Sequence, residues 1–284
     1  MRLDDLRPTE NVDDRRGAGF GGSGPRLAIG GGGLGLVAVV VLSLVFGVDP
    51  TQLLDTMNGG GAPYQQQANP GGPRADDAAY QFSRRIVGSA EDVWSPILRA
   101  EGVTFSSATL TTYDVATPTG CGTGQSSAGP FYCPADDHIY LDLAFYDELG
   151  SRFGAPGEFA RAYVVAHEYG HHIQNLLGVM ARHQTGSRGA DSDSVRTELQ
   201  ADCFAGVWAY HANQQFRILE SGDVEQGLQA ASAVGDDTLE KQSQGYVVPD
   251  SFTHGTSAQR IRWFQRGLQG GDIRACDTFS ARAL

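Results

Sequence analysis

Apolar residues recur every three or four positions through most of the second half of the chain, which is the period of helices with one buried face. Strand signals are shorter: β-branched and aromatic residues cluster in Ala108–Tyr113 and His138–Asp142. We therefore expect a helix-dominated α+β domain with a small β-sheet over residues 76–284, a normal length for one domain. The expected helices span Asp76–Glu101, Glu158–Met180, Ser194–Leu219, Val224–Val234 and Thr256–Leu268.

An uncharged apolar stretch runs from Leu27 to Val48, between Arg26 and Asp49. Its 22 residues would form a helix of about 33 Å, enough to cross the hydrocarbon core of a membrane. A cleaved signal peptide is the alternative, but the region before the stretch is long and no A-x-A-like site follows it. We therefore expect residues 27–48 to form one transmembrane helix.

Basic residues set the expected orientation of this segment. Arg15, Arg16 and Arg26 precede it closely, whereas Arg74 is the first basic residue after it. The positive-inside rule then places the N-terminus in the cytoplasm and the later residues outside. The expected parts are a cytoplasmic tail (1–26), the transmembrane helix (27–48), a flexible linker rich in Gly, Gln and Pro (49–75) and an extracytoplasmic domain (76–284).

Cysteine content and charge agree with an outer domain. All four cysteines follow the apolar stretch, and an even number permits full pairing. Three connectivities are possible, and proximity favours a disulfide between Cys121 and Cys133, which bracket a Gly- and Ser-rich loop; Cys203 would then pair with Cys276. Free buried thiols are the alternative. The formal charge of −12 argues against nucleic acid as a partner.

An H-E-x-x-H motif lies in the expected helix over Glu158–Met180. Because residues four apart share one helix face, His167 and His171 can direct their imidazoles at a single zinc ion. Glu168 lies about 100° around the helix, so it can reach a zinc-bound water without being a ligand, which suits a general base. The alternative is a buried helix whose histidines bond to their neighbours. His172 points to another face of the helix, so we expect it either to support a ligand through a hydrogen bond or to pack in the core.

Two histidines leave a catalytic zinc site one protein ligand short. Glu198 and Asp202 are four apart in the next expected helix, Ser194–Leu219, and share one face of it. Glu198 could bind zinc while Asp202 accepts a hydrogen bond from a ligating imidazole and fixes its tautomer. Asp202 is the rival third ligand, since either carboxylate binds zinc.

These residues resemble the gluzincin metallopeptidases, in which H-E-x-x-H is followed by a second helix with E-x-x-x-D. More narrowly, three stretches resemble the bacterial family of putative neutral zinc metallopeptidases. The resemblance covers most of the chain and implies a zincin-like domain, a membrane anchor and a Zn2+-dependent peptidase, with His167, His171 and Glu198 as ligands and Glu168 as general base. The three stretches are His167-Glu-Tyr-Gly-His-His-Ile-Gln174, Glu198-Leu-Gln-Ala-Asp-Cys-Phe-Ala-Gly-Val-Trp208 and His254-Gly-Thr-Ser-Ala-Gln-Arg260.

His254 opens the last of these stretches, just before the helix expected from Thr256. A histidine held near the zinc could stabilise the oxyanion of the tetrahedral intermediate, and Tyr246 is a second candidate donor. The alternative for His254 is a turn residue bonded to backbone. In zincin-like folds a strand near the cleft pairs with extended substrate, and Ile139–Leu141 is our candidate for it, with an ordinary core strand as the alternative.

The sequence therefore predicts a single-pass protein of the bacterial cell membrane whose outer domain hydrolyses peptide bonds in a peptide or protein substrate. Two other functions stay open. A non-catalytic zinc-binding envelope protein could use the same ligands, but it would not need Glu168 beside an open coordination position. A zinc amidase acting on cell-wall peptides is chemically possible, because the same activated water attacks any amide.

Overall fold

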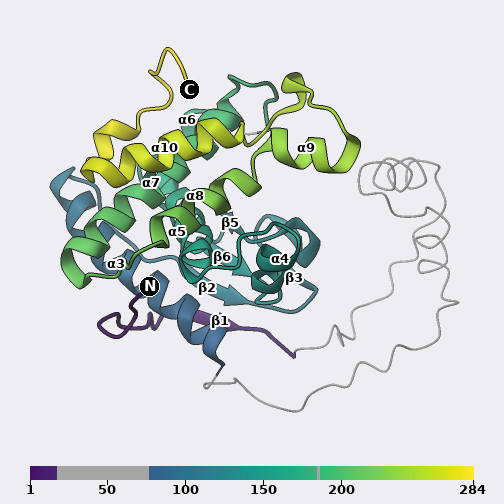
Figure 1. The fold of residues 1–284 in the computed structure, drawn as a ribbon. Helices are drawn as coiled ribbons and strands as arrows, with labels where there is room; N and C mark the ends of the chain where they lie inside the picture. Colours follow the sequence, from purple (N-terminus) through teal and green to yellow (C-terminus); the bar gives the residue numbers. More distant parts are fainter. Residues whose placement is uncertain (18–76, 184–185) are drawn as a thin grey trace, which may run out of the picture. The chain divides into compact units, whose positions relative to one another are not determined.

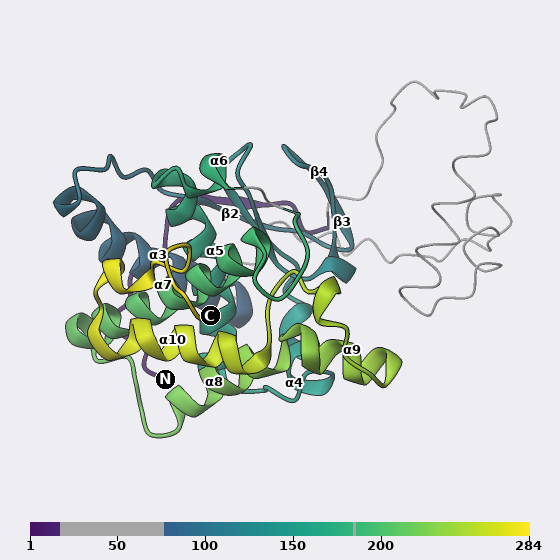
Figure 2. The ribbon, with the colours of Figure 1, turned by 90° about the horizontal axis from the view of Figure 1, so that it is seen from above.

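The computed structural model describes residues 1–17, 77–183 and 186–284. Its long helices are α3 (Ala78–Ala100), α5 (Glu158–Leu176), α7 (Asp193–Phe216) and α10 (Ser257–Gly270). Helix α5 is central, since it contacts α3, α7, α8 (Asp223–Ala233) and the sheet (Figures 1 and 2). The expected helix-rich α+β class is confirmed. Shorter helices are α4 (Phe145–Ser151), α6 (Val179–Arg182) and α9 (Asp236–Gln244), with 3-10 turns η1 (Ser126–Ala128), η2 (Pro249–Ser251) and η3 (Ile273–Cys276).

Five expected helices appear with small shifts at their ends. Asp77 caps α3, because its side chain accepts hydrogen bonds from the backbone N–H groups of Ala79 and Tyr80. Helix α5 ends earlier than expected, since Gly178 has φ of 70° and breaks the helical path before α6 begins. Thr256 and Gln259 form a capping box that starts α10.

The main sheet has the strand order β1-β2-β6-β5. Strands β1 (Val12–Asp14), β2 (Thr109–Thr112) and β6 (His138–Leu141) are parallel, and β5 (Phe131–Cys133) runs antiparallel to β6. A separate hairpin joins β3 (Ala116–Thr119) to β4 (Gly122–Gln125). Both expected strands are present. Strand β6 lies between β2 and β5, so it has no free edge for the substrate pairing that we expected at Ile139–Leu141. The edge on that side is β5.

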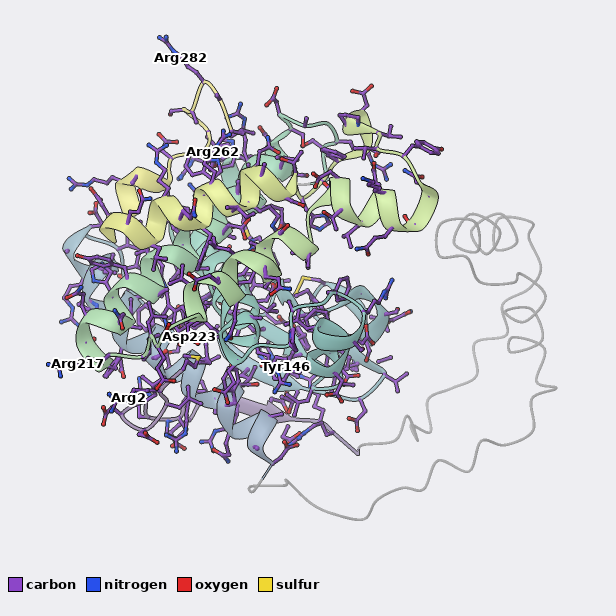
Figure 3. The ribbon with its side chains drawn as sticks, in the orientation of Figure 1. Arg2, Tyr146, Arg217, Asp223, Arg262 and Arg282 are labelled. Carbon is purple, nitrogen blue, oxygen red and sulfur yellow. A yellow bond between two sulfur atoms is a disulfide. The ribbon has the colours of Figure 1, made fainter. Side chains whose placement is uncertain are left out.

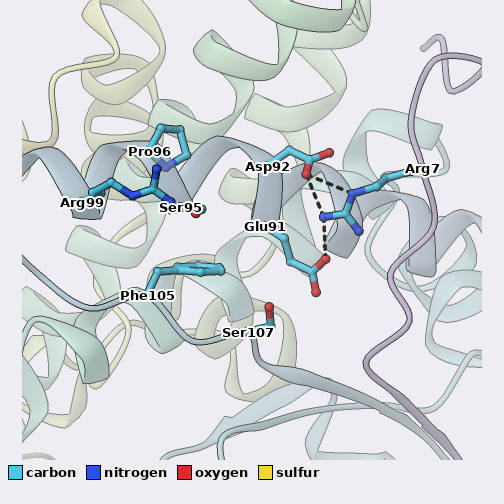
Figure 4. A pocket seen from close by; sticks show the side chains of 8 residues that line it. All are labelled: Arg7, Glu91, Asp92, Ser95, Pro96, Arg99, Phe105 and Ser107. Atoms are coloured by element: carbon cyan, nitrogen blue, oxygen red, sulfur yellow. Dashed lines mark hydrogen bonds and ion pairs between the residues drawn. The ribbon is translucent and has the colours of Figure 1, made fainter.

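Residues 1–16 belong to the same folded unit as the rest of the domain, whereas residues 1–26 were expected to form a separate tail. β1 adds a parallel strand to β2, with Val12 opposite Leu110. The Arg7 guanidinium donates to Asp92 and pairs with Glu91 in α3, across a surface pocket (Figure 4). The backbone N–H of Arg2 donates to the carbonyl of Ile218, which places the first residues at the α7–α8 connection (Figure 3).

The expected transmembrane helix, residues 27–48, lies outside the described residues, as do the linker 49–75 and residues 18–26 of the expected tail. In the parts of the chain that the structure describes, no helix combines the length and apolar character that a membrane crossing requires. The membrane anchor therefore stays a prediction from sequence.

Both expected disulfides are present. Cys121–Cys133 ties the β3–β4 turn to β5, with the Cα atoms 5.9 Å apart. Cys203–Cys276 ties α7 to η3, with the Cα atoms 5.5 Å apart. All four cysteines are thus paired, and the alternative of free thiols is excluded.

Helices α7 and α10 pack backbone to backbone. A Cβ atom at Gly267 of α10 would lie 2.0 Å from the carbonyl oxygen of Cys203, and one at Gly206 of α7 would lie 2.1 Å from the carbonyl oxygen of Phe264. Only glycine allows this approach. It brings the first turn of α10 next to the middle of α7, where the candidate site lies.

Candidate metal centre

Helix α5 carries the H-E-x-x-H motif and buries it. His167, Glu168 and His171 are only 7%, 7% and 9% exposed. Their helix is apolar on nearly every side because it lies between the sheet and α7, so the motif residues need polar partners from other elements. Helix α7 supplies Glu198 opposite the two histidines.

The helices meet closely at this point. A Cβ atom at Gly170, between the two motif histidines, would lie 2.9 Å from the carbonyl oxygen of Ala201 in α7. Glycine at this position lets α7 approach α5 near enough for Glu198 to reach the imidazoles. The two helices thereby form one site from two motifs that are far apart in sequence.

The three expected ligands converge. The Nε2 atom of His167 is 3.1 Å from Glu198 Oε2, and Nε2 of His171 is 3.5 Å from Glu198 Oε1. One ligand atom from each of the three side chains lies within 4.8 Å of the others, and among the described residues this is the one such group. Two imidazole nitrogens and a carboxylate oxygen form a ligand set that zinc commonly takes in catalytic sites.

Hydrogen bonds behind the site fix which nitrogen of each histidine faces inward. His167 Nδ1 is 2.9 Å from a carboxylate oxygen of Asp202, and His171 Nδ1 is 2.8 Å from Oε1 of Gln174. Both partners are acceptors, so each Nδ1 carries the hydrogen and each Nε2 presents a lone pair. Two lone pairs and a carboxylate that face one another need a cation between them. The residues present therefore fit a zinc ion.

A proton can take that cation's place in the bare protein. Burial disfavours a charged His167, but the carboxylates of Asp202 and Glu198 outweigh it and raise the pKa of His167 to about 10. Burial also raises the pKa of Glu198, yet the surrounding histidines hold it well below its ordinary value. Burial is the largest effect on His171 and lowers its pKa. Zinc binding would displace a proton from His167.

Asp202 is fully buried and acts as the hub behind His167. Its carboxylate accepts from His167, from the hydroxyl of Tyr163, and twice from Arg260, at 2.9 Å each for the guanidinium contacts. Burial raises the pKa of Asp202, but Arg260 and His167 lower it below its ordinary value. With both oxygens engaged in this way, Asp202 faces Nδ1 of His167 rather than the converging Nε2 atoms.

Glu168 lies beside the ligand group without belonging to it. Burial raises the pKa of Glu168 to about 7, with the charge of Glu198 adding to the rise and His167 and Arg260 opposing it. The backbone N–H of Tyr132 in β5 donates to its carboxylate. A carboxylate that titrates near neutrality is suited to accept and return a proton.

His254 precedes α10 and is held by Asp236 at the start of α9. The backbone N–H groups of Thr253, His254 and Gly255 all donate to one oxygen of Asp236, and the other oxygen is 3.1 Å from His254 Nδ1. The His254 side chain is 50% exposed, so its Nε2 side is open. His254 and Glu198 shift each other's pKa through their charges, which places His254 within electrostatic range of the ligand group.

Two other expected residues are not drawn into the ligand group. Tyr246 is 62% exposed, in the turn after α9. His172 is fully buried behind β5, where its Nε2 donates to the carbonyl of Ser106 and its Nδ1 is 3.1 Å from the Tyr132 hydroxyl. His172 therefore links α5 to the sheet, in keeping with the packing role expected for it.

Sequence reasoning missed several partners of the site. Gln174 and Arg260 close two of the quoted motifs, so their position in a motif was a signal, but no spacing rule assigned them a role. Asp236 and Tyr132 carried no signal at all. Asp236 contacts His254 and Tyr132 contacts Glu168, and in each pair the two residues are distant in sequence. Only the packing of α9 and β5 brings them together.

Comparison with known proteins agrees with this geometry. A family model described as "putative neutral zinc metallopeptidase" matches residues 1–279. The chain is 49% identical over 288 residues to "Uncharacterized protein YpfJ" of Escherichia coli K12, covering 98% of this chain and 99% of that protein. It is 48% identical over 206 residues to "Uncharacterized protein Rv2575" of Mycobacterium tuberculosis H37Rv, covering 69% of each chain.

No solved structure matches the chain. The family model spans nearly all of the sequence, including the three motif stretches that carried the expected resemblance. The chain therefore belongs to the putative neutral zinc metallopeptidase family.

Proposed function

We propose that this protein is a zinc-dependent peptidase that hydrolyses peptide bonds with Glu168 as general base. The observation that carries the proposal is the juxtaposition of Glu168, whose pKa is raised to about 7, with a buried group of two imidazoles and one carboxylate. His167, His171 and Glu198 would hold the ion. A site built only to store zinc would gain nothing from a titratable carboxylate beside the ligands.

A bound zinc ion would supply Lewis acidity, which polarises a substrate carbonyl and makes a water molecule acidic enough to deprotonate near neutral pH. Glu168 takes the proton from the attacking water and then delivers it to the departing amine. Burial supports both steps, because it raises the pKa of Glu168 to about 7, where the carboxylate can both accept and release a proton near neutral pH.

His254 is the proposed donor to the developing oxyanion. Asp236 holds Nδ1 of His254, so the protonated ring presents Nε2–H to the open side. Such a donor stabilises negative charge that appears only in the transition state, a contribution of a few kcal/mol in comparable sites. Tyr246 is a weaker candidate, since it is largely exposed.

Strand β5 is the proposed seat of the substrate main chain. The backbone N–H of Tyr132 reaches Glu168, so the side of β5 that faces away from β6 lies beside the metal centre. An extended peptide can add to such an edge through main-chain hydrogen bonds. This places the substrate strand one position further out than Ile139–Leu141.

We further propose that the folded unit, residues 1–16 together with 77–284, is extracytoplasmic and that residues 27–48 attach it to the bacterial membrane. Two disulfides in the domain support an oxidising compartment. Cell-wall amide hydrolysis uses the same residues and stays the second candidate. Peptide hydrolysis is favoured over cell-wall amide hydrolysis, because a peptide can present the extended main chain that pairing with β5 requires.

The deciding experiment profiles a diverse peptide library by mass spectrometry after incubation with the full-length, zinc-loaded protein. Glu168→Gln should bind one equivalent of zinc and lose activity by at least about a hundredfold. Glu158→Gln is the matched control, because it makes the same chemical change on the exposed first turn of α5. Full activity in Glu168→Gln would refute the mechanism. Zinc binding without cleavage by the unmodified protein would shift the assignment to the amidase or the binding protein.

A further inference from the structure

His171, the second metal ligand, is oriented through Gln174 rather than through a carboxylate. Gln174 lies one helical turn after His171 and is fully buried. Its Oε1 accepts from His171 Nδ1 at 2.8 Å. A side-chain amide can rotate by half a turn and would then present its NH2 group to His171, which would reverse the histidine's tautomer. The amide therefore needs its own anchor.

Helix α7 provides that anchor. Nε2 of Gln174 donates to the carbonyl of Thr197 at 2.7 Å and to Oε1 of Gln200 at 3.0 Å. Both partners are acceptors, and the Gln174 side chain is 0% exposed, so bulk water does not compete for these hydrogen bonds. Rotating the Gln174 amide would bring its Oε1 against the Thr197 carbonyl oxygen and Oε1 of Gln200, where no hydrogen bond can form.

The side-chain amide of Gln200 could also rotate by half a turn, and a different contact holds it in place. Its Nε2 donates to the backbone carbonyl of Cys276 at 3.0 Å, which leaves Oε1 to face Gln174. Cys276 lies in η3, beyond α10, and is bound to α7 through the disulfide with Cys203. The described C-terminal segment thus completes a hydrogen-bonded chain that runs from His171 through Gln174 and Gln200 to Cys276.

We propose that Gln200 is a positioning residue for the metal centre and that the Cys203–Cys276 disulfide, by holding the Cys276 carbonyl in place, sets the affinity of the site for its metal. This chain of hydrogen bonds keeps the hydrogen of His171 on Nδ1, so that the lone pair of Nε2 faces Glu198. Full metal affinity therefore requires the disulfide, and a reduced protein binds metal more weakly. This inference rests on the metal centre proposed above.

The test measures metal affinity, not catalysis. The full-length protein is titrated with Zn2+ against a chelator of known affinity, and with Co2+, whose visible spectrum reports ligand geometry. Gln200→Leu keeps the side-chain size and removes both hydrogen bonds. It should weaken Zn2+ binding about tenfold, within the range seen when partners behind a metal ligand are removed. The Co2+ spectrum should change, and the apo protein should stay folded by circular dichroism.

A double-mutant cycle separates this chain from a general loss of stability. In the Cys203→Ala/Cys276→Ala protein, Zn2+ affinity should already be weakened. Adding Gln200→Leu should lower that affinity by less than about a further threefold, because both changes break the same chain of hydrogen bonds. Independent structural effects would multiply instead. Cys121→Ala/Cys133→Ala is the matched control: it removes the other disulfide and should leave Zn2+ affinity unchanged.

Each outcome decides the matter. Unchanged Zn2+ affinity in Gln200→Leu, or the same loss with and without the disulfide, would overturn the positioning role while leaving the metal centre intact. Equal weakening by removal of either disulfide would overturn the specific role of Cys203–Cys276. A wild-type protein that binds no Zn2+ would overturn the metal centre and this inference together.

Discussion

Neighbouring residues in α5 acquire opposite properties from their surroundings. Both His167 and Glu168 are buried, which disfavours the charged form of each. His167 nevertheless gains a proton readily because two carboxylates face it, whereas Glu168 has no cation at close range strong enough to restore its ordinary pKa. His167 is thereby a basic nitrogen suited to bind a metal ion, and Glu168 is suited to accept and release a proton near neutral pH.

The pH dependence of activity should report His254. Loss of water on the half of the ring that faces the protein lowers the pKa of His254, but the hydrogen bond to Asp236 and the charge of Glu198 raise it above 6.5 overall. A neutral His254 keeps its hydrogen on Nδ1, facing Asp236, and has none on Nε2. The oxyanion donor is therefore present below the raised pKa and is lost as pH rises through it.

Asp236→Asn removes one of the charges that raise this pKa. We expect the alkaline limb of kcat against pH to move to lower pH, with a lower plateau because the loop over Thr253–Gly255 loses its common acceptor. Steady-state kinetics over the neutral and alkaline range measures this. An alkaline limb at the same pH in the variant would remove His254 from the role proposed for it.

At the scale of elements, three helices form the site through close backbone contacts. Gly170 admits α7 to α5, and Gly206 and Gly267 admit α10 to α7. The second contact carries Arg260 to Asp202, where its guanidinium makes a buried ion pair. The geometry of the candidate metal centre thus depends on three glycines that would not themselves bind the ion.

Gly267→Ala tests the contact between α7 and α10. The added methyl would lie 2.0 Å from the Cys203 carbonyl oxygen, so the helices must separate. We expect a loss of unfolding free energy of about 1–3 kcal/mol, typical of overpacked sites. Gly270→Ala is the control on the same helix, since nothing lies within 4 Å of its Cβ position. It should be neutral or stabilise by up to about 1 kcal/mol.

Urea denaturation of the two variants makes the comparison. Equal stability of Gly267→Ala and Gly270→Ala would show that α10 does not approach α7 as closely as described. In that case Arg260 would also lose its tight contact with Asp202, and the network behind His167 would need another anchor.

At the scale of the whole molecule, the packing of residues 1–16 conflicts with one part of the predicted topology. A single membrane crossing by residues 27–48 would place β1 and the rest of the domain on opposite sides. Yet β1 pairs with β2, and Arg7 pairs with α3. In this fold, residues 1–16 and 77–284 must share one compartment.

Labelling by a membrane-impermeant maleimide in intact cells tests this consequence. Glu10→Cys and Arg282→Cys each place one thiol at an exposed position, and the native cysteines are all paired. We expect both variants to be labelled to the same extent, because both positions belong to one folded unit. Labelling of Arg282→Cys alone would support the cytoplasmic tail and would show that β1 does not pack as described.

Local spacing accounts for what sequence could predict. The long helices and both expected strands follow from period and residue type, although β6 was taken for the substrate-pairing strand and has no free edge. The pairing of Cys203 with Cys276 followed by elimination once Cys121 and Cys133 were joined across a short loop. The position of β1 in the sheet could not be predicted, because its three residues form a strand only by adding to β2.

The sequence by itself identified the candidate ligand set, because helical geometry places residues four apart on one face: His167 with His171, and Glu198 with its rival Asp202. Tertiary structure alone decided what surrounds that set. Arg260, Asp236, Tyr132 and the Cys276 carbonyl reach the site from α10, α9, β5 and η3. These contacts join residues far apart in the chain, and their distances depend on how whole elements pack, which no local period encodes.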